Sequence, residues 1–247
     1  MKATLEICAG DMASVIAAAQ GGADRVELCQ GLAVGGLTPS IGFIKMARKV
    51  PGIKMHVLIR PREGDFVYTD EEIECMIHDI KAARSCNADG IVIGALMPDG
   101  RIDMNTCRIL ADEAEGMSVT FHRAFDLARD PMEALEDVMT LGCDRILTSG
   151  QAPDALSGAE ILFRLQKAAG HRLSIMAGCG VTSSNAAEIL RRSGCSEIHA
   201  SARRIQLSSM TYRNESVAMG AAGSDEYIRK STHRDEVRAI VDSINQI

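Results

Sequence analysis

The chain alternates between a short strand-like run and a helical segment along its whole length. A turn and an acidic residue followed by a short β-rich run recur at residues 21–29, 86–94, 141–150 and 193–201, and four further strand candidates lie at 3–9, 53–61, 117–125 and 173–181. Each run precedes a segment with apolar residues at helical spacing, such as Met12, Val15 and Ile16 after the run at 3–9. Eight such units in 247 residues predict an α/β protein, a single-domain (βα)8 TIM barrel spanning residues 1–247.

The longest irregular stretch, residues 203–224, follows the eighth strand-like run. It contains Gly220 and Gly223 with small residues between them. A loop in this position lies over the mouth of a barrel, so we expect either a lid or a simple connection.

Composition excludes several classes of partner. The net charge of −6 and the 3% aromatic content disfavour nucleic acid, which requires basic surfaces and stacking side chains. No apolar run approaches the roughly 20 residues that cross a bilayer, and no secretory leader begins the chain, so we expect a cytoplasmic protein without membrane contact. The eight cysteines are scattered singly, which is typical of reduced thiols.

Two strand-like runs near the start carry the same pattern, Glu6-Ile7-Cys8 and Glu27-Leu28-Cys29. Neighbouring strands lie about 4.8 Å apart, and thiolates select soft metal ions, so Cys8 and Cys29 could share one ion. The alternative is that both cysteines are ordinary buried packing residues. Cys179 is a weaker third candidate ligand.

The carboxyl ends of barrel strands build the active site in proteins of this fold, and here they are polar. They indicate a second hypothesis, an enzyme acting on a small phosphorylated or carboxylated metabolite. The Arg60 and Arg62 side chains are suited to clamping an anion, and histidines there are suited to acid–base work. The candidate catalytic residues are Glu6, Glu27, Arg60, His122, Asp126 and His199. For each residue alone, the alternative is a structural ion pair.

A glycine-rich turn at residues 178–181 precedes a helical segment. Such turns bring backbone N–H groups to phosphate, although a tight packing turn has the same pattern. The candidate ligand-binding residues for a small anionic molecule are Arg62, Ser149, Gly178, Gly180, Ser201 and Arg203.

Two other chemistries are less favoured. A divalent ion held by Glu6, Glu27, His122 and His199 is a third variant, but inward-pointing Arg60 and Arg62 would repel a cation. No lysine stands at a strand end, which disfavours a Schiff-base aldolase.

Several long motifs occur in order along the chain: ELC-Q-GL-x-V-GGLTPS-x-G at 27–42, IRPR-x-GDF-x-Y at 59–68, TFHRAFD at 120–126, RILTSG at 145–150 and G-x-GV at 178–181. Together they resemble the CutC family of copper homeostasis proteins, and the resemblance extends from Glu6 to about Arg203. It implies a TIM barrel, a cytoplasmic location, a homo-oligomer and an association with copper. If that association is direct binding of Cu(I), Cys8 and Cys29 are the candidate ligands.

Overall fold

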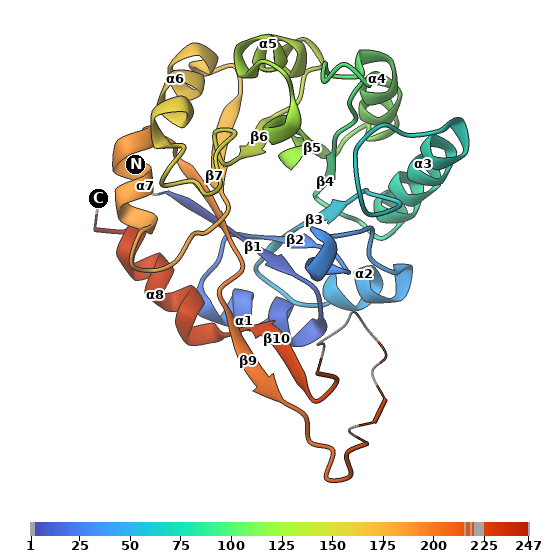
Figure 1. Ribbon diagram of the computed structural model, residues 1–247, viewed down its shortest axis with the longest axis vertical. Helices are drawn as coiled ribbons and strands as arrows, with labels where there is room; N and C mark the ends of the chain where they lie inside the picture. The colour runs from blue at the N-terminus through green and yellow to red at the C-terminus, as the bar shows by residue number, and fades with distance from the viewer. Residues whose placement is uncertain (1–2, 215, 218, 220–224, 247) are drawn as a thin grey trace.

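The computed structural model describes residues 3–214, 216–217, 219 and 225–246, and within them eight parallel strands close into a barrel (Figure 1). The predicted (βα)8 TIM barrel is therefore confirmed. The barrel strands are β1 (Thr4–Ala9), β2 (Arg25–Leu28), β3 (Lys54–Leu58), β4 (Gly90–Ile93), β5 (Ser118–Phe121), β6 (Arg145–Thr148), β7 (Ser174–Gly178) and β8 (Glu197–Ala200). Each strand pairs with the next along the chain, and β1 pairs with β8.

Helices surround the strands as an outer ring (Figure 1). They are α1 (Met12–Gly21), α2 (Ile41–Ala47), α3 (Asp70–Ser85), α4 (Met104–Glu113), α5 (Pro131–Thr140), α6 (Ala159–Ala169), α7 (Ala186–Ser193) and α8 (Arg234–Ile244), with 3-10 turns η1 (Leu32–Val34) and η2 (Arg123–Leu127). Several begin at a side chain that accepts a backbone N–H of the first turn, among them Asp11, Thr69, Asp103 and Asp130. These caps stabilise the helix ends directly after the strands. None of the described helices combines the length and apolarity needed to cross a membrane.

The two faces of each barrel strand differ sharply in polarity. Leu5, Ile7 and Leu28 face outward and belong to the large apolar core beneath the helices. The inward face is polar: the guanidinium of Arg25 on β2 reaches the sulfur of Met176 on β7, a strand that is not its neighbour, at 3.2 Å. The alternation of Glu and Cys with aliphatic residues in β1 and β2 is explained by this division.

Glycines on and beside β4 leave space for two histidines inside the barrel. A Cβ atom at Gly90 would lie 2.6 Å from Nε2 of His56, and one at Gly94 would lie 2.6 Å from the His122 ring. The imidazoles of β3 and of the segment after β5 therefore pack directly against the β4 backbone.

The variant Gly94→Ala is expected to displace the His122 ring and to lower the free energy of unfolding by about 1–3 kcal/mol, as overpacking of a filled core does. Urea unfolding measures the change. Gly42→Ala is the matched control, because its new Cβ meets nothing closer than Ser40 Oγ at 3.9 Å; in α2 it should gain about 0.5 kcal/mol. Equal stability of Gly94→Ala and the wild-type protein would contradict this packing.

The segment after β8 differs in part from the predicted irregular stretch at 203–224. Residues Arg203–Leu207 form β9, which pairs antiparallel with β10 (Ile228–Thr232). The partner strand lies some twenty residues further along the chain, so local patterning does not reveal the pairing. Ser231 and Ser14 hydroxyls lie 3.0 Å apart and tie the hairpin base to α1.

The described part of this segment extends outward beyond α1 and α2 rather than across the ring of strands (Figure 1). Residues 215, 218 and 220–224 lie outside the described residues. The lid therefore stays a prediction for that part of the chain.

Candidate functional site

A cavity of about 430 Å³ opens at the carboxyl ends of the barrel strands. This is the end at which barrels of this fold place their active sites, and the volume suits a small metabolite. Its charged and polar lining includes Glu27, Arg60, His122, His199, Ser201 and Arg203. The structure thus brings six of the predicted site residues together around one space, while Gly180 lines the same cavity from the turn after β7.

The floor of the cavity holds an imidazole between two carboxylates. His199 of β8 lies with Nδ1 at 2.8 Å from Glu6 Oε1, and its Nε2 lies 4.0 Å from Glu27 Oε2. Glu6 is fully buried below the cavity, whereas Glu27 lines it. Glu6 therefore orients the ring, and the other nitrogen faces Glu27 and the cavity.

These groups have strongly perturbed acidities. Burial raises the pKa of Glu27 to about 7, with the charge of Glu6 adding to the rise and His199 opposing it. Burial alone would favour neutral Glu6, but Arg25 and His199 hold its pKa well below the usual range. Burial also opposes a charged His199, yet hydrogen bonding with Cys8 and Glu6 raises its pKa well above the usual value. The site pairs a fixed carboxylate and an imidazolium with a carboxyl group that titrates near neutral pH.

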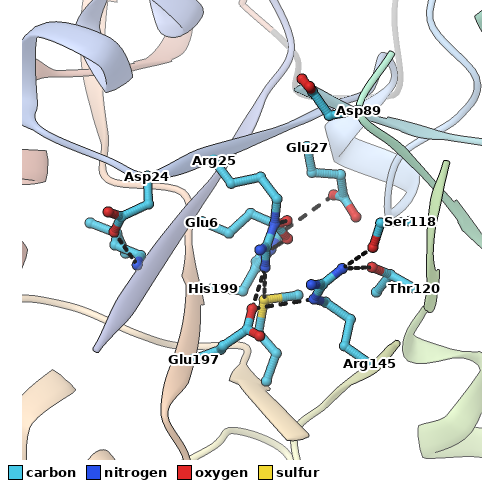
Figure 2. Close-up of polar contacts among 12 residues, drawn as sticks. Glu6, Asp24, Arg25, Glu27, Asp89, Ser118, Thr120, Arg145, Glu197 and His199 are labelled. Carbon is cyan, nitrogen blue, oxygen red and sulfur yellow. Dashed lines mark hydrogen bonds and ion pairs between the residues drawn. The ribbon is translucent and has the colours of Figure 1, made fainter. Parts of the chain in front are cut away.

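A charged network lies beneath this floor, inside the barrel (Figure 2). Arg25 donates from Nε to Glu6, and its Nη2 donates to Glu197 at 2.5 Å. The Glu197 carboxylate also accepts from Arg145 at 3.2 Å. Arg145 in turn donates to the Thr120 hydroxyl at 3.1 Å. The network anchors the Glu6 carboxylate from below, so the orientation of His199 depends on residues of four strands.

His122 occupies the opposite wall of the cavity, at the end of β5. Its Nδ1 accepts the Ala124 N–H at 3.1 Å, and its ring packs 4.9 Å from that of Phe66. Burial, together with the positive charge of Arg60, lowers its pKa to about 3. The ring is therefore neutral at physiological pH and is separate from the His199 pair.

Arg60 mainly stabilises loop structure, and its guanidinium is not free to bind an anion with all its N–H groups. Its guanidinium donates to the backbone carbonyls of Val34, Gly36 and Gly64 at 2.8–2.9 Å. It also lies 4.9 Å from the Phe66 ring. The side chain lines the cavity and adds positive charge there, while it holds together the loops after β2 and β3.

Three other predicted residues are placed away from the cavity lining. Arg62 donates to Glu72 at 2.6 Å and to Asp65 at 3.0 Å on the surface. Asp126 accepts from the Thr148 hydroxyl at 2.5 Å and from Arg123 at 2.7 Å. The Ser149 hydroxyl donates to the Ala152 carbonyl at 2.7 Å. These contacts organise loops around the mouth.

The predicted anion-binding residues of the last two strands surround one side of the mouth. Gly180, Ser201 and Arg203 line the cavity, and Gly178 ends β7 beneath them. A Cβ at Gly178 would approach Leu147 Cδ1 to 2.5 Å and His199 Cβ to 3.3 Å. Arg203 forms no ion pair within the described part of the chain. Arg60 also lacks a carboxylate partner among those residues, but backbone carbonyls hold its guanidinium, so Arg203 is the better placed of the two to bind an anion.

The two predicted copper ligands share a small apolar cluster inside the barrel. Cys8 and Cys29 pack with Leu58 and Val92, and Leu32 covers them. Cys8 reaches the cavity, whereas Cys29 is completely buried. Burial, with the nearby Glu27 charge, raises the pKa of the Cys29 thiol well above its usual value. Two sulfur donors in an apolar shell fit a soft monovalent ion, provided that the thiol protons leave.

A harder ion would find a different donor set. Ligand atoms of Glu6, Glu27 and His199 all lie within 4.8 Å of one another. His122, the fourth residue of that hypothesis, is not part of this group. Both Glu6 oxygens already accept from Arg25 and His199, so a divalent ion would have to displace existing partners.

Sequence reasoning missed the inward-facing polar residues that support the site, namely Arg25, His56, Arg145 and Glu197. A signal existed for two of them, because Arg25 precedes Glu27 by two positions and Glu197 precedes His199 by two positions. Polar residues at every second position of a strand share its inward face. They therefore continue the polar interior from the mouth of the barrel toward the amino ends of the strands.

A family model described as the CutC family matches residues 3–204. A CutC family protein of Chromobacterium violaceum is 51% identical over 246 residues, with 100% of both chains covered. This chain belongs to the CutC family. A second CutC family protein, from Bacteroides fragilis, is 47% identical over 241 residues, with 97% of this chain and 96% of the relative covered.

Solved structures agree with this family membership. A CutC protein of Streptococcus agalactiae, named for copper homeostasis, superposes with a TM-score of 0.77 at 34% identity, covering 80% of this chain and 97% of its own. Thiamine phosphate pyrophosphorylase of Pyrococcus furiosus superposes with a TM-score of 0.61 at 15% identity, covering 99% and 96%. The latter similarity shows the shared barrel fold alone.

Proposed function

We propose that the mouth of the barrel is an acid–base catalytic site for a small anionic metabolite. One observation carries the proposal: Glu27, a carboxyl group with a pKa of about 7, lines the cavity beside an imidazole that Glu6 orients. A general base works best when its pKa lies near the working pH, and perturbed groups of this kind cluster at active sites. Glu27 is the proposed acid–base group, and His199 and Glu6 tune it.

The lining supports an anionic ligand. Arg203 and Ser201 face the same space as Glu27, and Gly180 allows a close backbone approach. Arg60 adds positive charge that attracts an anion, and so does His199, because its raised pKa favours the imidazolium form. A phosphate or carboxylate at this side of the mouth places the rest of a small molecule over Glu27.

The proposal is tested by incubating the protein in D₂O with a panel of small phosphorylated and carboxylated metabolites. Proton NMR then follows conversion or carbon–hydrogen exchange. At least one compound should be changed by the wild-type protein and not by Glu27→Gln prepared identically. If no compound is changed, and none raises the unfolding temperature, the catalytic proposal fails.

A second function is Cu(I) binding of the kind the family name implies. The shared apolar cluster of Cys8 and Cys29, with Cys8 open to the cavity, favours it. Such a role treats the ion as cargo carried by two thiolates. Binding must release the thiol protons, so affinity should rise with pH.

Cys8→Ser with Cys29→Ser is expected to abolish stoichiometric Cu(I) binding, because oxygen replaces both soft donors. Competition against a chromogenic Cu(I) chelator under reducing conditions measures the affinity. Cys75→Ser is the control, since Cys75 is an exposed cysteine of α3. Undiminished binding by the double variant would exclude this pair as the site.

We also propose a cytoplasmic location and a homo-oligomer. All eight cysteines are free thiols, as a reducing compartment favours. The β9–β10 hairpin exposes Ile205, Leu207 and Tyr212, and apolar side chains on a protruding arm suit contact with another copy. Light scattering after size-exclusion chromatography gives the mass that tests this.

A further inference from the structure

The His122 ring has one nitrogen engaged in a hydrogen bond and one that is buried without a partner among the described residues. Nδ1 accepts the Ala124 backbone N–H at 3.1 Å, so a neutral ring carries its proton on Nε2. That buried Nε2 has no hydrogen-bond partner among the described residues. His122 also lines the cavity, so this unsatisfied donor belongs to the wall of the space in which a ligand would lie.

The surroundings fix both the position and the charge of the ring. Phe66 packs 4.9 Å from one side, Phe121 lies 6.0 Å away, and Gly94 leaves no room for movement toward β4. The Arg60 guanidinium is the charged group whose field acts on the ring, and it disfavours a second positive charge. A buried donor without a partner costs about 1–3 kcal/mol, so its retention indicates a function that uses it.

We propose that the Nε2–H of neutral His122 donates a hydrogen bond to a substrate carbonyl oxygen, and that the substrate is a small phosphorylated α-hydroxy carbonyl compound. This rests on the proposed function of Glu27 as the acid–base group. A neutral imidazole that is held in one tautomer donates a hydrogen bond to a carbonyl oxygen. It polarises the carbonyl group and keeps its own proton. Glu27 and His122 line opposite sides of the same cavity, one on β2 and the other after β5.

The reaction step balances without a further reactant. The Glu27 carboxylate takes the proton from the carbon next to the carbonyl, and that carbon–hydrogen electron pair forms a carbon–carbon double bond. The carbonyl π pair moves to oxygen, where the enolate accepts the hydrogen bond from His122. Protonated Glu27 returns a proton to the same carbon, which gives exchange with no net oxidation. Return to the adjacent carbon gives isomerisation when the α-hydroxyl proton also moves to the enolate oxygen, so that the former hydroxyl oxygen becomes the new carbonyl.

The phosphate group of such a substrate would lie beside Arg203, on the side of the cavity formed by the ends of β7 and β8. Arg203 has no ion pair among the described residues, and Ser201 and Gly180 line the cavity beside it. An anion held there lies at the ends of β7 and β8, next to His199. The carbon skeleton then extends toward the centre of the mouth, between Glu27 and His122.

The experiment follows deuterium incorporation into dihydroxyacetone phosphate and ribulose 5-phosphate in D₂O, with glycerol 3-phosphate as the compound that lacks a carbonyl. The wild-type protein should exchange the carbonyl compounds. His122→Gln should slow the exchange by about 10²-fold, as loss of one oxyanion donor does. Glu27→Gln, prepared identically, excludes a contaminating enzyme as the source.

A substrate-independent measurement keeps the inference testable if His122→Gln folds poorly. In ¹⁵N-histidine-labelled wild-type protein, His122 should show a protonated Nε2 and an unprotonated Nδ1, unchanged from pH 5 to pH 9. A proton on Nδ1, or an imidazolium at pH 6, would overturn the proposal. So would equal exchange by His122→Gln.

The two proposals fail differently. Glu27-dependent turnover of a compound without a carbonyl, with no exchange of carbonyl compounds, overturns the role of His122 and leaves the catalytic function of Glu27 standing. No turnover of any compound overturns both.

Discussion

Glu27→Gln is expected to slow carbon–hydrogen exchange of an accepted substrate by about 10²–10⁴-fold, the usual contribution of a general base. The amide keeps the shape of the side chain but cannot take a proton. Burial raises the pKa of Glu27 to about 7, so the substitution removes the carboxyl group that changes charge near neutral pH. Exposed Glu63 is the matched position, and Glu63→Gln should retain the wild-type rate.

The pH dependence has a definite sign. The base is the ionised form of Glu27, so the wild-type rate should rise with pH through an apparent pKa near 7. The charged groups that face it are His199, Glu6 and Arg25, and Cys29 lies close by. A rate that falls over pH 6–8 would contradict this assignment.

Stability supplies an independent check on the same variant. A folded pKa of about 7 exceeds the ordinary glutamate pKa of 4.5, so the folded state holds this proton more tightly than the unfolded state. That contribution to stability is complete below pH 4.5 and is lost as pH rises to about 7. The amide of the substituted side chain cannot ionise, so Glu27→Gln does not undergo this decrease in stability. At pH 8 the free energy of unfolding of the variant should be at least as large as that of the wild-type protein.

Arg25→Met is expected to lower the free energy of unfolding by about 3–5 kcal/mol, because it leaves a buried carboxylate without its charge partner. Glu6 is fully buried and Arg25 only 4% exposed, so water cannot compensate either group. Glu197 loses a second contact, at 2.5 Å. Chemical denaturation at pH 7.5 measures the change.

The controls for Arg25→Met separate charge burial from lost volume. Arg129→Met removes an exposed pair with Glu133, which solvent and salt screen, so it should cost far less stability than Arg25→Met. Adding Glu6→Gln to Arg25→Met should recover part of the loss, since the unpaired charge is gone. Equal costs for Arg25→Met and Arg129→Met would contradict the role assigned to this network.

The Arg25→Met effect should also shrink in acid. In the wild-type protein Arg25 holds the Glu6 pKa well below the ordinary glutamate pKa of 4.5. The stabilisation from ionised Glu6 is therefore present above about pH 4.5 and is lost as pH falls further. In the variant Glu6 is protonated more easily, so the two proteins should converge below that pH.

Much of the candidate site was predictable because strand ends are local features. Glu6, Glu27 and His199 stand at or near the carboxyl ends of runs with clear β patterning, and the barrel brings such ends to one mouth. The roles were less predictable. Arg60 and Asp126 have the residue types of an active site, yet their polar atoms contact backbone carbonyls and loop groups.

The eightfold β–α alternation, the family and the inward polar face of the first two strands are predictable from the sequence, because periodicity and motifs are local properties of the chain. Which charged side chains meet depends on how the chain folds back on itself. Arg25 and Glu197 are 172 residues apart along the chain, and His199 lies against Glu6 only because β8 closes the barrel on β1. Burial and charge proximity set acidity, so the near-neutral pKa of Glu27 and the neutral ring of His122 follow from the closed barrel.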